Sequence, residues 1–363
     1  MKKLVIIYLI VTFGVINNLF SQSVGDLRSR YTNSFVYGFA PQEGDIFYDN
    51  LYNWNNVNSW EEWNGSSWVY PASKVPDENT NVTIRGGGWY YFSANSKCKN
   101  LTINSGAELC FVDVFNSLKV EIYGNLTVSA NSIFKCEFYN NVNSANTLII
   151  YGNVLNNGFF DMYDYHIILA KECYADLFIA GGTNTTFTTN TGSTTDLLSL
   201  FLVKDDIDKE LKFVYNGGTL SGQNYTQYGF LYLYEMNYPV GTFRLSGTGT
   251  LSYFIFNPDG AEYGVGEYCN FIMDNPNFKI GGAGLFYNPK EPFKLKGGLE
   301  LRQGSIMYIG DNITPRDNNL IIFENAELLV QSGQFAVMGG IIDSCNTCYY
   351  TQTGGEVFVG VKG

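Results

Sequence analysis

The chain has 363 residues, with 34 acidic against 22 basic side chains and a formal net charge of -12. An acidic chain without any cluster of lysine and arginine is unsuited to bind nucleic acid or an anionic membrane surface through its charge. Hydrophobic residues make up 45% of the chain, which is enough to build a core and excludes general disorder.

Residues 1–22 predict a secretory signal peptide. Met1-Lys2-Lys3 is a basic start, an apolar run follows it, and Ser21-Gln22-Ser23 offers small and polar residues for cleavage. The apolar run is interrupted by Asn17-Asn18 and is short for a bilayer span, so we expect no membrane span after cleavage. The protein is therefore expected to be secreted or held at the cell surface.

Residues 23–90 form an irregular lead and a tryptophan-rich region that contains all five tryptophans of the chain. One interpretation is an aromatic platform on which sugars stack. The other is a bulky cap, which the first lap of a repeat structure needs to cover its open core and strand edges. We favour the cap. The ligand-binding candidates under the first interpretation are Trp60, Trp63, Trp68 and Trp89.

The clearest structural signal runs from Leu101 to Phe160. Apolar and polar residues alternate with a period of two, as in Leu118 to Ile122, which is typical of half-buried strands. The unit Ile122-Tyr-Gly-Asn125 returns as Ile150-Tyr-Gly-Asn153, and no helical segment fits between the copies. Short strands that repeat without a crossover helix predict a solenoid.

Strand-like runs separated by glycine-containing turns continue to Val359. We therefore predict an all-β fold, a single-stranded parallel β-helix (β-solenoid) over residues 91–363, with laps of roughly 20 to 28 residues behind the tryptophan-rich cap. A β-sandwich is the alternative, because strands alone do not fix their connections. The chain stops on a strand-like run, so we expect it to be truncated at this end or covered by a partner.

The seven cysteines suggest one local disulfide. Cys110 and Cys136 lie on apolar strand faces and are interpreted as buried small residues rather than as a bridge. Cys345-Asn-Thr-Cys348 is a C-x-x-C pair between strands. Zinc would need a second pair or histidine ligands, and a redox motif would need a helix start. A disulfide between Cys345 and Cys348 is the interpretation that suits an exported chain.

The chain offers little that could carry catalysis. His166 is the single histidine, and no nucleophile motif accompanies it. Asp205, Asp206 and Asp208 lack the spacing of a calcium loop. Glycoside cleavage would need paired carboxylates in a groove, and we find no acidic residues repeated at one position of successive laps. We expect no catalytic residue, no cofactor and no metal.

Five stretches carry a resemblance to known proteins: Trp60–Ile84, Lys99–Leu109, Leu118–Leu126, Gln331-Ser-Gly333 and Tyr350–Gly355. They resemble large secreted β-helix surface proteins of Gram-negative bacteria that use the type IX secretion route, and distantly the opening of G8-type β-helical domains. The resemblance implies a cell-surface or secreted scaffold that is often adhesive. It supplies no catalytic residues, and the C-terminal sorting domain of that family is missing from this sequence.

The functional prediction is an exported, non-catalytic β-solenoid that serves as a structural or adhesion module of the cell surface. Its expected partners are an extracellular glycan, a surface protein or further repeats of the same protein. The alternatives are a polysaccharide-active β-helix, a lyase or hydrolase, and a carbohydrate-binding module that uses the tryptophan-rich region.

Overall fold

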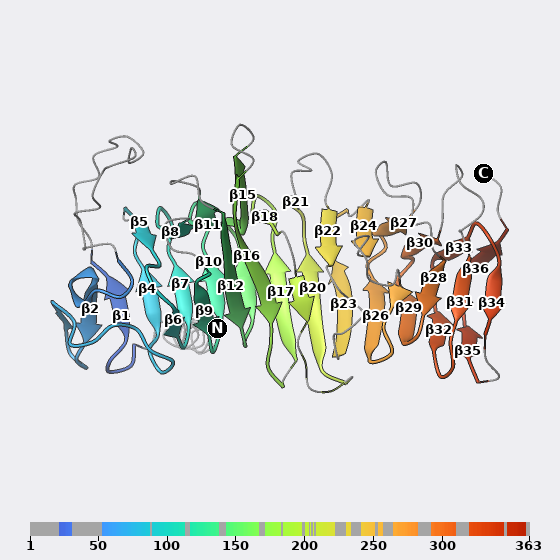
Figure 1. The fold of residues 1–363 in the computed structure, drawn as a ribbon, viewed down its shortest axis with the longest axis horizontal. Helices are drawn as coiled ribbons and strands as arrows, with labels where there is room; N and C mark the ends of the chain where they lie inside the picture. The colour runs from blue at the N-terminus through green and yellow to red at the C-terminus, as the bar shows by residue number, and fades with distance from the viewer. Residues whose placement is uncertain are drawn as a thin grey trace, which may run out of the picture.

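The chain folds as a parallel β-solenoid, whose strands stack along the long axis of the molecule (Figure 1). The prediction of the fold class is confirmed, and the β-sandwich alternative is excluded. The computed structural model describes residues 22–30, 53–87, 89–112, 117–137, 143–166, 171–182, 184–197, 200–202, 204, 206, 208–221, 230–233, 241–250, 253–256, 264–281, 292–309, 319–344 and 347–360. The predicted signal peptide, apart from Gln22, lies outside these residues.

One long sheet of 14 strands runs the length of the solenoid and receives one strand from each lap. Its strands are parallel from β1 to β35, and β2 and β3 extend it by antiparallel pairing at the N-terminal end. In spatial order the strands are β3 (Trp68–Val69), β2 (Trp60–Trp63), β1 (Leu27–Ser29), β4 (Val82–Ile84), β7 (Leu101–Ile103), β10 (Leu126–Val128), β13 (Val154–Asn156), β17 (Thr185–Thr189), β20 (Glu210–Tyr215), β23 (Gly241–Gly247), β26 (Cys269–Asp274), β29 (Gly298–Arg302), β32 (Glu327–Val330) and β35 (Tyr349–Gln352).

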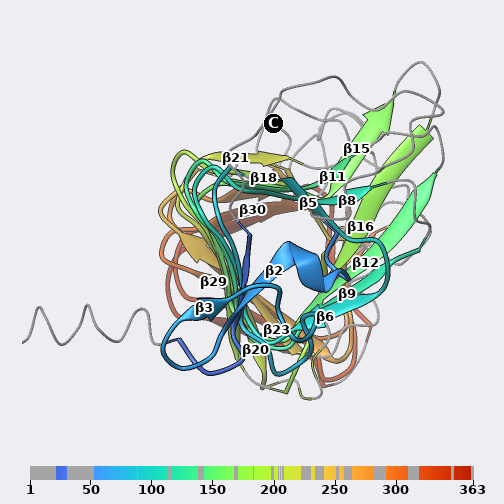
Figure 2. The same ribbon diagram turned by 90° about the vertical axis from the view of Figure 1, so that its left-hand side faces the viewer.

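Two shorter sheets close the N-terminal part of the solenoid. The second sheet contains β5 (Trp89–Tyr91), β8 (Glu108–Val112), β11 (Ile133–Glu137), β14 (Phe159–Asp161), β18 (Thr194–Asp196) and β21 (Thr219–Ser221). The third sheet contains β6 (Ser96–Cys98), β9 (Lys119–Ile122), β12 (Ser144–Ile150), β16 (Lys171–Ile179) and β15 (Tyr163–His166), and β19 (Leu200–Leu202) also pairs with β16. The end view shows the sheets surrounding a common interior (Figure 2).

Separate small sheets accompany the long sheet in the C-terminal part. They are the pair β22 (Phe230–Leu233) and β24 (Tyr253–Phe256), the set β25 (Gly264–Val265), β28 (Phe293–Leu295), β31 (Leu320–Ile322) and β34 (Ile341–Asp343), and the set β27 (Lys279–Gly281), β30 (Ile306–Ile309), β33 (Gln334–Val337) and β36 (Glu356–Val359). Within the described residues, the one helical element is the short 3-10 turn η2 (Val57–Ser59).

The register of the long sheet gives the length of each lap. Val82 pairs with Leu101, so this lap advances 101 - 82 = 19 residues. Val154 pairs with Phe187, an advance of 187 - 154 = 33 residues. The number of residues per lap therefore varies more widely than the roughly 20 to 28 expected from the repeated turns. The strands keep their register from lap to lap, and the loops between them differ in length.

The interior is filled by one continuous column of apolar side chains. Its centre is a run of phenylalanines, each from the next lap, with ring centroids 5.0 to 6.5 Å apart. Contacts of this kind contribute about 0.5–1.5 kcal/mol per pair beyond the burial of area. The stacked rings belong to Phe111, Phe134, Phe160, Phe187, Phe213, Phe243 and Phe271.

The repeated Tyr-Gly-Asn unit forms a corner at which successive laps touch. A Cβ atom on Gly152 would lie 2.4 Å from the carbonyl oxygen of Gly124, so only glycine fits there. The Asn125 side chain accepts a hydrogen bond from the Asn153 backbone N–H at 2.8 Å. The rings of Tyr123 and Tyr151 stack outside the corner, with centroids 5.1 Å apart. The repeat therefore encodes the spacing between laps.

The tryptophan-rich region closes the N-terminal end of the core. Trp54 and Trp60 are fully buried and meet edge to face, with ring centroids 5.2 Å apart. The Trp60 Nε1–H donates to the Trp54 carbonyl oxygen at 2.8 Å, and the Trp54 ring contacts Phe92, which joins the core. Parallel pairing already begins at β1 and β4, so the solenoid starts before residue 91.

The C-terminal end exposes apolar side chains on β34, β35 and β36, each at the edge of its sheet. Tyr349 is 58% exposed and Val359 is 52% exposed. These three strands contain no lysine or proline, the residues that commonly block an edge against pairing. The edge is therefore chemically able to accept another strand.

Candidate functional site

A row of polar residues crosses the outside of the second sheet. The register aligns Cys110, Lys135, Asp161 and Asp196 on neighbouring strands. Side chains alternate across a sheet, and Phe160, next to Asp161, lies in the core. These four residues, called the outer row below, therefore lie on the opposite face of the sheet from the core.

Lys135 neutralises the first part of the outer row. Its ammonium lies 3.0 Å from a carboxylate oxygen of Glu108 and 2.9 Å from one of Glu137. Burial acts to lower the pKa of Lys135, but hydrogen bonds to the carboxylates of Glu137 and Glu108 raise it above its ordinary value. Burial also raises the pKa of Cys110 well above normal, so this residue stays a thiol and donates to Glu137 at 3.4 Å.

Glu108, Cys110 and Glu137 each place a possible metal ligand atom within 4.8 Å of the others, and among the described residues this is the one group of that kind. One thiol and two carboxylates are a donor set that a divalent metal could use. Both carboxylates are already paired with Lys135, so a metal ion would have to displace that ammonium. The prediction of no metal is not tested by this geometry.

Asp161 and Asp196 occupy the same position of successive laps. Burial, the charge of Asp196 and the charge of Asp164 raise the pKa of Asp161 to about 7, although the Tyr163 N–H and Lys135 act in the opposite direction. Neighbouring strands lie about 4.8 Å apart. A carboxyl group that titrates near neutrality beside a second carboxyl can donate or accept a proton.

This carboxyl pair corrects the expectation that no acidic residues repeat at one lap position. The signal was hidden because Lys135 and Asp161 are 161 - 135 = 26 residues apart, whereas Asp161 and Asp196 are 196 - 161 = 35 residues apart. The unequal insertions between strands remove the fixed sequence period by which a stacked pair is recognised.

The structure separates the four tryptophans proposed to bind ligand. Trp60 is fully buried in the cap and has no face on which a sugar could stack. The prediction that Trp60 binds a ligand is therefore wrong. Trp63 and Trp68 are half-buried partners across β2 and β3, with ring centroids 5.5 Å apart. Trp89 lies instead beside Tyr91 at the start of the second sheet.

Charged groups surround the Trp63–Trp68 pair. The Arg28 guanidinium lies 4.2 Å from the centre of the Trp68 ring and bonds Glu61 at 2.6 Å. Together Arg28, Glu61, Trp63 and Trp68 are called the tryptophan surface below. Aromatic rings beside a guanidinium and a carboxylate provide the stacking faces and hydrogen-bonding groups that a carbohydrate uses.

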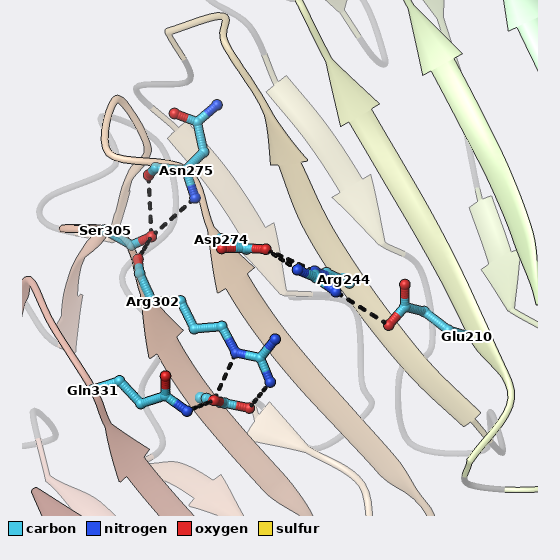
Figure 3. Close-up of polar contacts among 8 residues, drawn as sticks. Glu210, Arg244, Asp274, Asn275, Arg302, Ser305 and Gln331 are labelled. Carbon is cyan, nitrogen blue, oxygen red and sulfur yellow. Dashed lines mark hydrogen bonds and ion pairs between the residues drawn. The ribbon is translucent and has the colours of Figure 1, made fainter. Parts of the chain in front are cut away.

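A second set of polar side chains lies on the long sheet: Glu210, Arg244 and Asp274 come from three successive laps, and the pair Glu300–Arg302 belongs to the next lap (Figure 3). Arg244 bonds Asp274, whose side chain is 4% exposed, and lies 3.9 Å from Glu210. The other oxygen of Asp274, Oδ1, is buried and has no hydrogen-bond partner. Arg302 forms two bonds to Glu300 at 2.6 and 2.7 Å. This set is composed of mutually paired charges, which suits a structural role.

The remaining candidates from the sequence are scattered. His166 pairs through its backbone with Lys171 in the β15–β16 hairpin. Asp206 and Asp208 are exposed, and the Asp208 N–H donates to Asp206 Oδ1 at 3.0 Å, which is turn chemistry. Asp205 and Cys345 lie outside the described residues. Cys348 donates to Asp343 at 2.6 Å, and the Cys345–Cys348 disulfide stays a prediction.

The fold defines the class as a parallel β-solenoid with an aromatic N-terminal cap. No family model matches the chain, and no curated protein or solved structure matches it. No helix in the described part of the chain has the length and apolar character needed to cross a bilayer.

Proposed function

We propose that this protein is an exported, non-catalytic β-solenoid that serves as a structural or adhesion module of the cell surface. The observation that carries the proposal is the single apolar column, which runs without a break from the tryptophan cap to the last laps. Such a core, with parallel hydrogen bonding between laps, produces a stiff rod rather than a cleft. The signal-peptide pattern and the resemblance to type IX cargo support export.

The two ends of the rod have different expected roles. The N-terminal end is closed by β2, β3 and the buried tryptophans, so it does not offer an open core. The exposed strands β34, β35 and β36 offer backbone groups and apolar side chains to further repeats or to a surface partner.

Export is tested by fractionation of cells that produce the full chain, with surface protease treatment of intact cells. We expect the chain to be secreted or degraded at the surface, and a variant lacking residues 1–22 to remain inside and protected. Full-length protein that stays in the cytoplasm would overturn the proposal. The folded state of both forms is compared by circular dichroism, so that misfolding is not mistaken for retention.

Adhesion is expected to use the tryptophan surface. Substitution Trp63→Ala removes one stacking face and should abolish binding on a glycan array while the thermal melting curve changes little, because Trp63 is half-buried. Trp89→Ala is the matched control, since Trp89 lies on another sheet. Equal glycan binding by the Trp63→Ala variant and the parent would exclude this surface.

A polysaccharide-active enzyme is the second candidate, and the carboxyl pair Asp161–Asp196 is the observation that favours it. Paired carboxyl groups roughly 5 Å apart are the arrangement of retaining glycosidases. The purified protein is assayed on acidic and neutral glycans. Turnover that is lost in Asp196→Asn but kept in Asp206→Asn would establish the enzyme, and no turnover on any glycan would favour the scaffold.

A further inference from the structure

A row of uncharged side chains runs along the outside of the long sheet, one from each of five successive laps. The register places them directly opposite one another from lap to lap. Each lies between two buried residues of its strand, so it points away from the core. These residues, called the threonine row below, are Thr83, Thr102, Thr127, Leu155 and Thr188.

The threonine row begins at the tryptophan surface. Arg28 pairs directly with Thr83 on one side and with Glu61 on the other. The strands follow in the order β2, β1, β4, β7, β10, β13 and β17 along the long axis (Figure 1). Neighbouring strands lie about 4.8 Å apart, so the row extends about 19 Å from Thr83 to Thr188. The stacking rings and the row therefore form one continuous surface.

The row is neutral, although the chain as a whole is acidic. Strands β4, β7, β10, β13 and β17 contain no charged residue. Charged residues border the row at both ends, with Arg28 and Glu61 before it and Glu210 and Lys212 on the next strand, β20, after it. A neutral ligand can cover the row without taking a charge out of water, whereas an acidic ligand finds no cation along it.

Threonine presents a hydroxyl and a methyl group at each lap. No hydrogen bond joins the four threonine hydroxyls to another described residue, so each can donate to a ligand and accept from it. The branched side chain has few rotamers in a strand, so binding a ligand orders little. Leu155, which is 38% exposed, continues the apolar contact at the one lap without a hydroxyl. The row thus repeats similar contacts at the spacing of the laps.

We infer that the tryptophan surface and the threonine row together bind one extended, neutral, β-1,4-linked glycan chain that lies along the solenoid. This inference rests on the proposed adhesion at the tryptophan surface and names its ligand class. A β-1,4-linked chain is stretched out and advances by nearly one lap spacing for each sugar. Its hydroxyls meet the threonine hydroxyls, while the apolar faces of its rings contact the methyl groups and stack on Trp63 or Trp68.

Calorimetric titration with oligosaccharides of increasing length tests the inference. The probes are neutral cello-, xylo- and N-acetylchito-oligosaccharides from disaccharide to hexasaccharide, and oligogalacturonates of the same lengths are the acidic comparison. For at least one neutral series, we expect the Kd to fall about 2- to 10-fold with each added sugar until the row is covered, because each sugar gains about one hydrogen bond. The disaccharide, which covers the tryptophan surface alone, should bind most weakly.

Thr102→Val and Thr127→Val each remove one hydroxyl and keep the shape of the side chain. Both should weaken hexasaccharide binding about 2- to 10-fold and leave disaccharide binding unchanged. Thr219→Val is the matched control, since Thr219 is exposed on the second sheet, and it should change neither. Valine suits a strand position, and equal urea midpoints for all the variants check that the fold is kept.

The results separate the inference from the proposed adhesion. Glycan binding that depends on Trp63 but not on chain length, or that is tighter for oligogalacturonates, would overturn the inference and leave adhesion at the tryptophan surface intact. Failure of all three neutral series, with Trp63-dependent binding of another glycan on an array, would do the same. Equal hexasaccharide binding by the parent and both row variants would also overturn it. A parent that binds no glycan in either assay would refute the inference and the adhesion together.

Discussion

Substitution Gly152→Ala tests whether the Tyr-Gly-Asn corner sets the spacing between laps. The added Cβ atom would lie 2.4 Å from the Gly124 carbonyl oxygen and 2.5 Å from its carbon, so its two nearest contacts are rigid backbone, and Asn125 Oδ1 would lie 2.8 Å away. The clash must be relieved by moving two laps apart. That movement would lengthen the bond from the Gly152 N–H to the Gly124 oxygen, now 3.0 Å.

The size of the effect follows from these contacts. Overpacking a tight site destabilises by about 1–3 kcal/mol. Weakening two hydrogen bonds, the one from Gly152 and the one from Asn153 to Asn125, adds about 1 kcal/mol each. The lower entropy of the unfolded alanine chain offsets about 0.4–1 kcal/mol. The free energy of unfolding should therefore fall by about 3 kcal/mol.

Gly192→Ala is the matched control. Gly192 has a φ of +85° but no atom within 4 Å of an added Cβ, so only backbone strain opposes the substitution. That strain is about 1–2 kcal/mol. Urea unfolding followed by circular dichroism should give a much larger loss for Gly152→Ala at an unchanged slope. Equal losses in the two variants, or a larger loss in Gly192→Ala, would refute the idea that contact between laps selects the corner glycine.

Three further outcomes are expected. Arg244→Ala should lower the free energy of unfolding in urea by about 3–5 kcal/mol, because it leaves the buried Asp274 carboxylate unpaired. The control Arg302→Ala should lower it by about 1 kcal/mol or less, because its partner Glu300 is nearer to solvent. Equal losses in the two variants would contradict this. Asn156→Ala should lower the free energy of unfolding by about 2–3 kcal/mol, since its buried amide donates to Thr194 and Thr195 at 2.8 Å. A smaller loss than in the exposed control Asn64→Ala would contradict a stabilising role for these two hydrogen bonds. The Asp161 pKa of about 7 lies above the unfolded value of 3.8, so the folded state holds the extra proton and stability should fall as pH rises from 4 to 7. Asp161→Asn should remove that fall and be more stable than the parent at pH 8, as measured by melting temperature across pH; an unchanged pH profile would show that Asp161 titrates normally.

The solenoid could be predicted from the sequence because its strongest constraints are local. Period-two alternation places Val120 and Ile122 in the core, and the Tyr-Gly-Asn unit records the contact between laps that only glycine permits. The cap could also be predicted, because an open core requires bulky apolar cover. Composition alone does not distinguish a buried ring from an exposed one, so the sequence also presents Trp60 as a binding candidate although its ring is buried.

The groupings of side chains could not be predicted because they depend on register between laps of unequal length. The hydrogen bond from the Asn156 amide to the Thr195 hydroxyl joins the long sheet to the second sheet, and no sequence period connects residues on different sheets. The tryptophan surface depends on the antiparallel pairing of β2 with β3, which departs from the parallel rule of the other laps. Such contacts require the pairing of strands to be known residue by residue.

The Asp161–Asp196 pair gives the sharpest distinction between a scaffold and an enzyme. Among the described residues, Asp161 is a carboxyl group that the fold disfavours in its charged form, so at neutral pH it opposes folding. A scaffold gains nothing from such a group, and Asp161→Asn should then be more stable with unchanged glycan binding. An enzyme uses it as an acid or base, and the same substitution should then raise stability while it abolishes turnover. Measuring both properties on one variant separates the two functions.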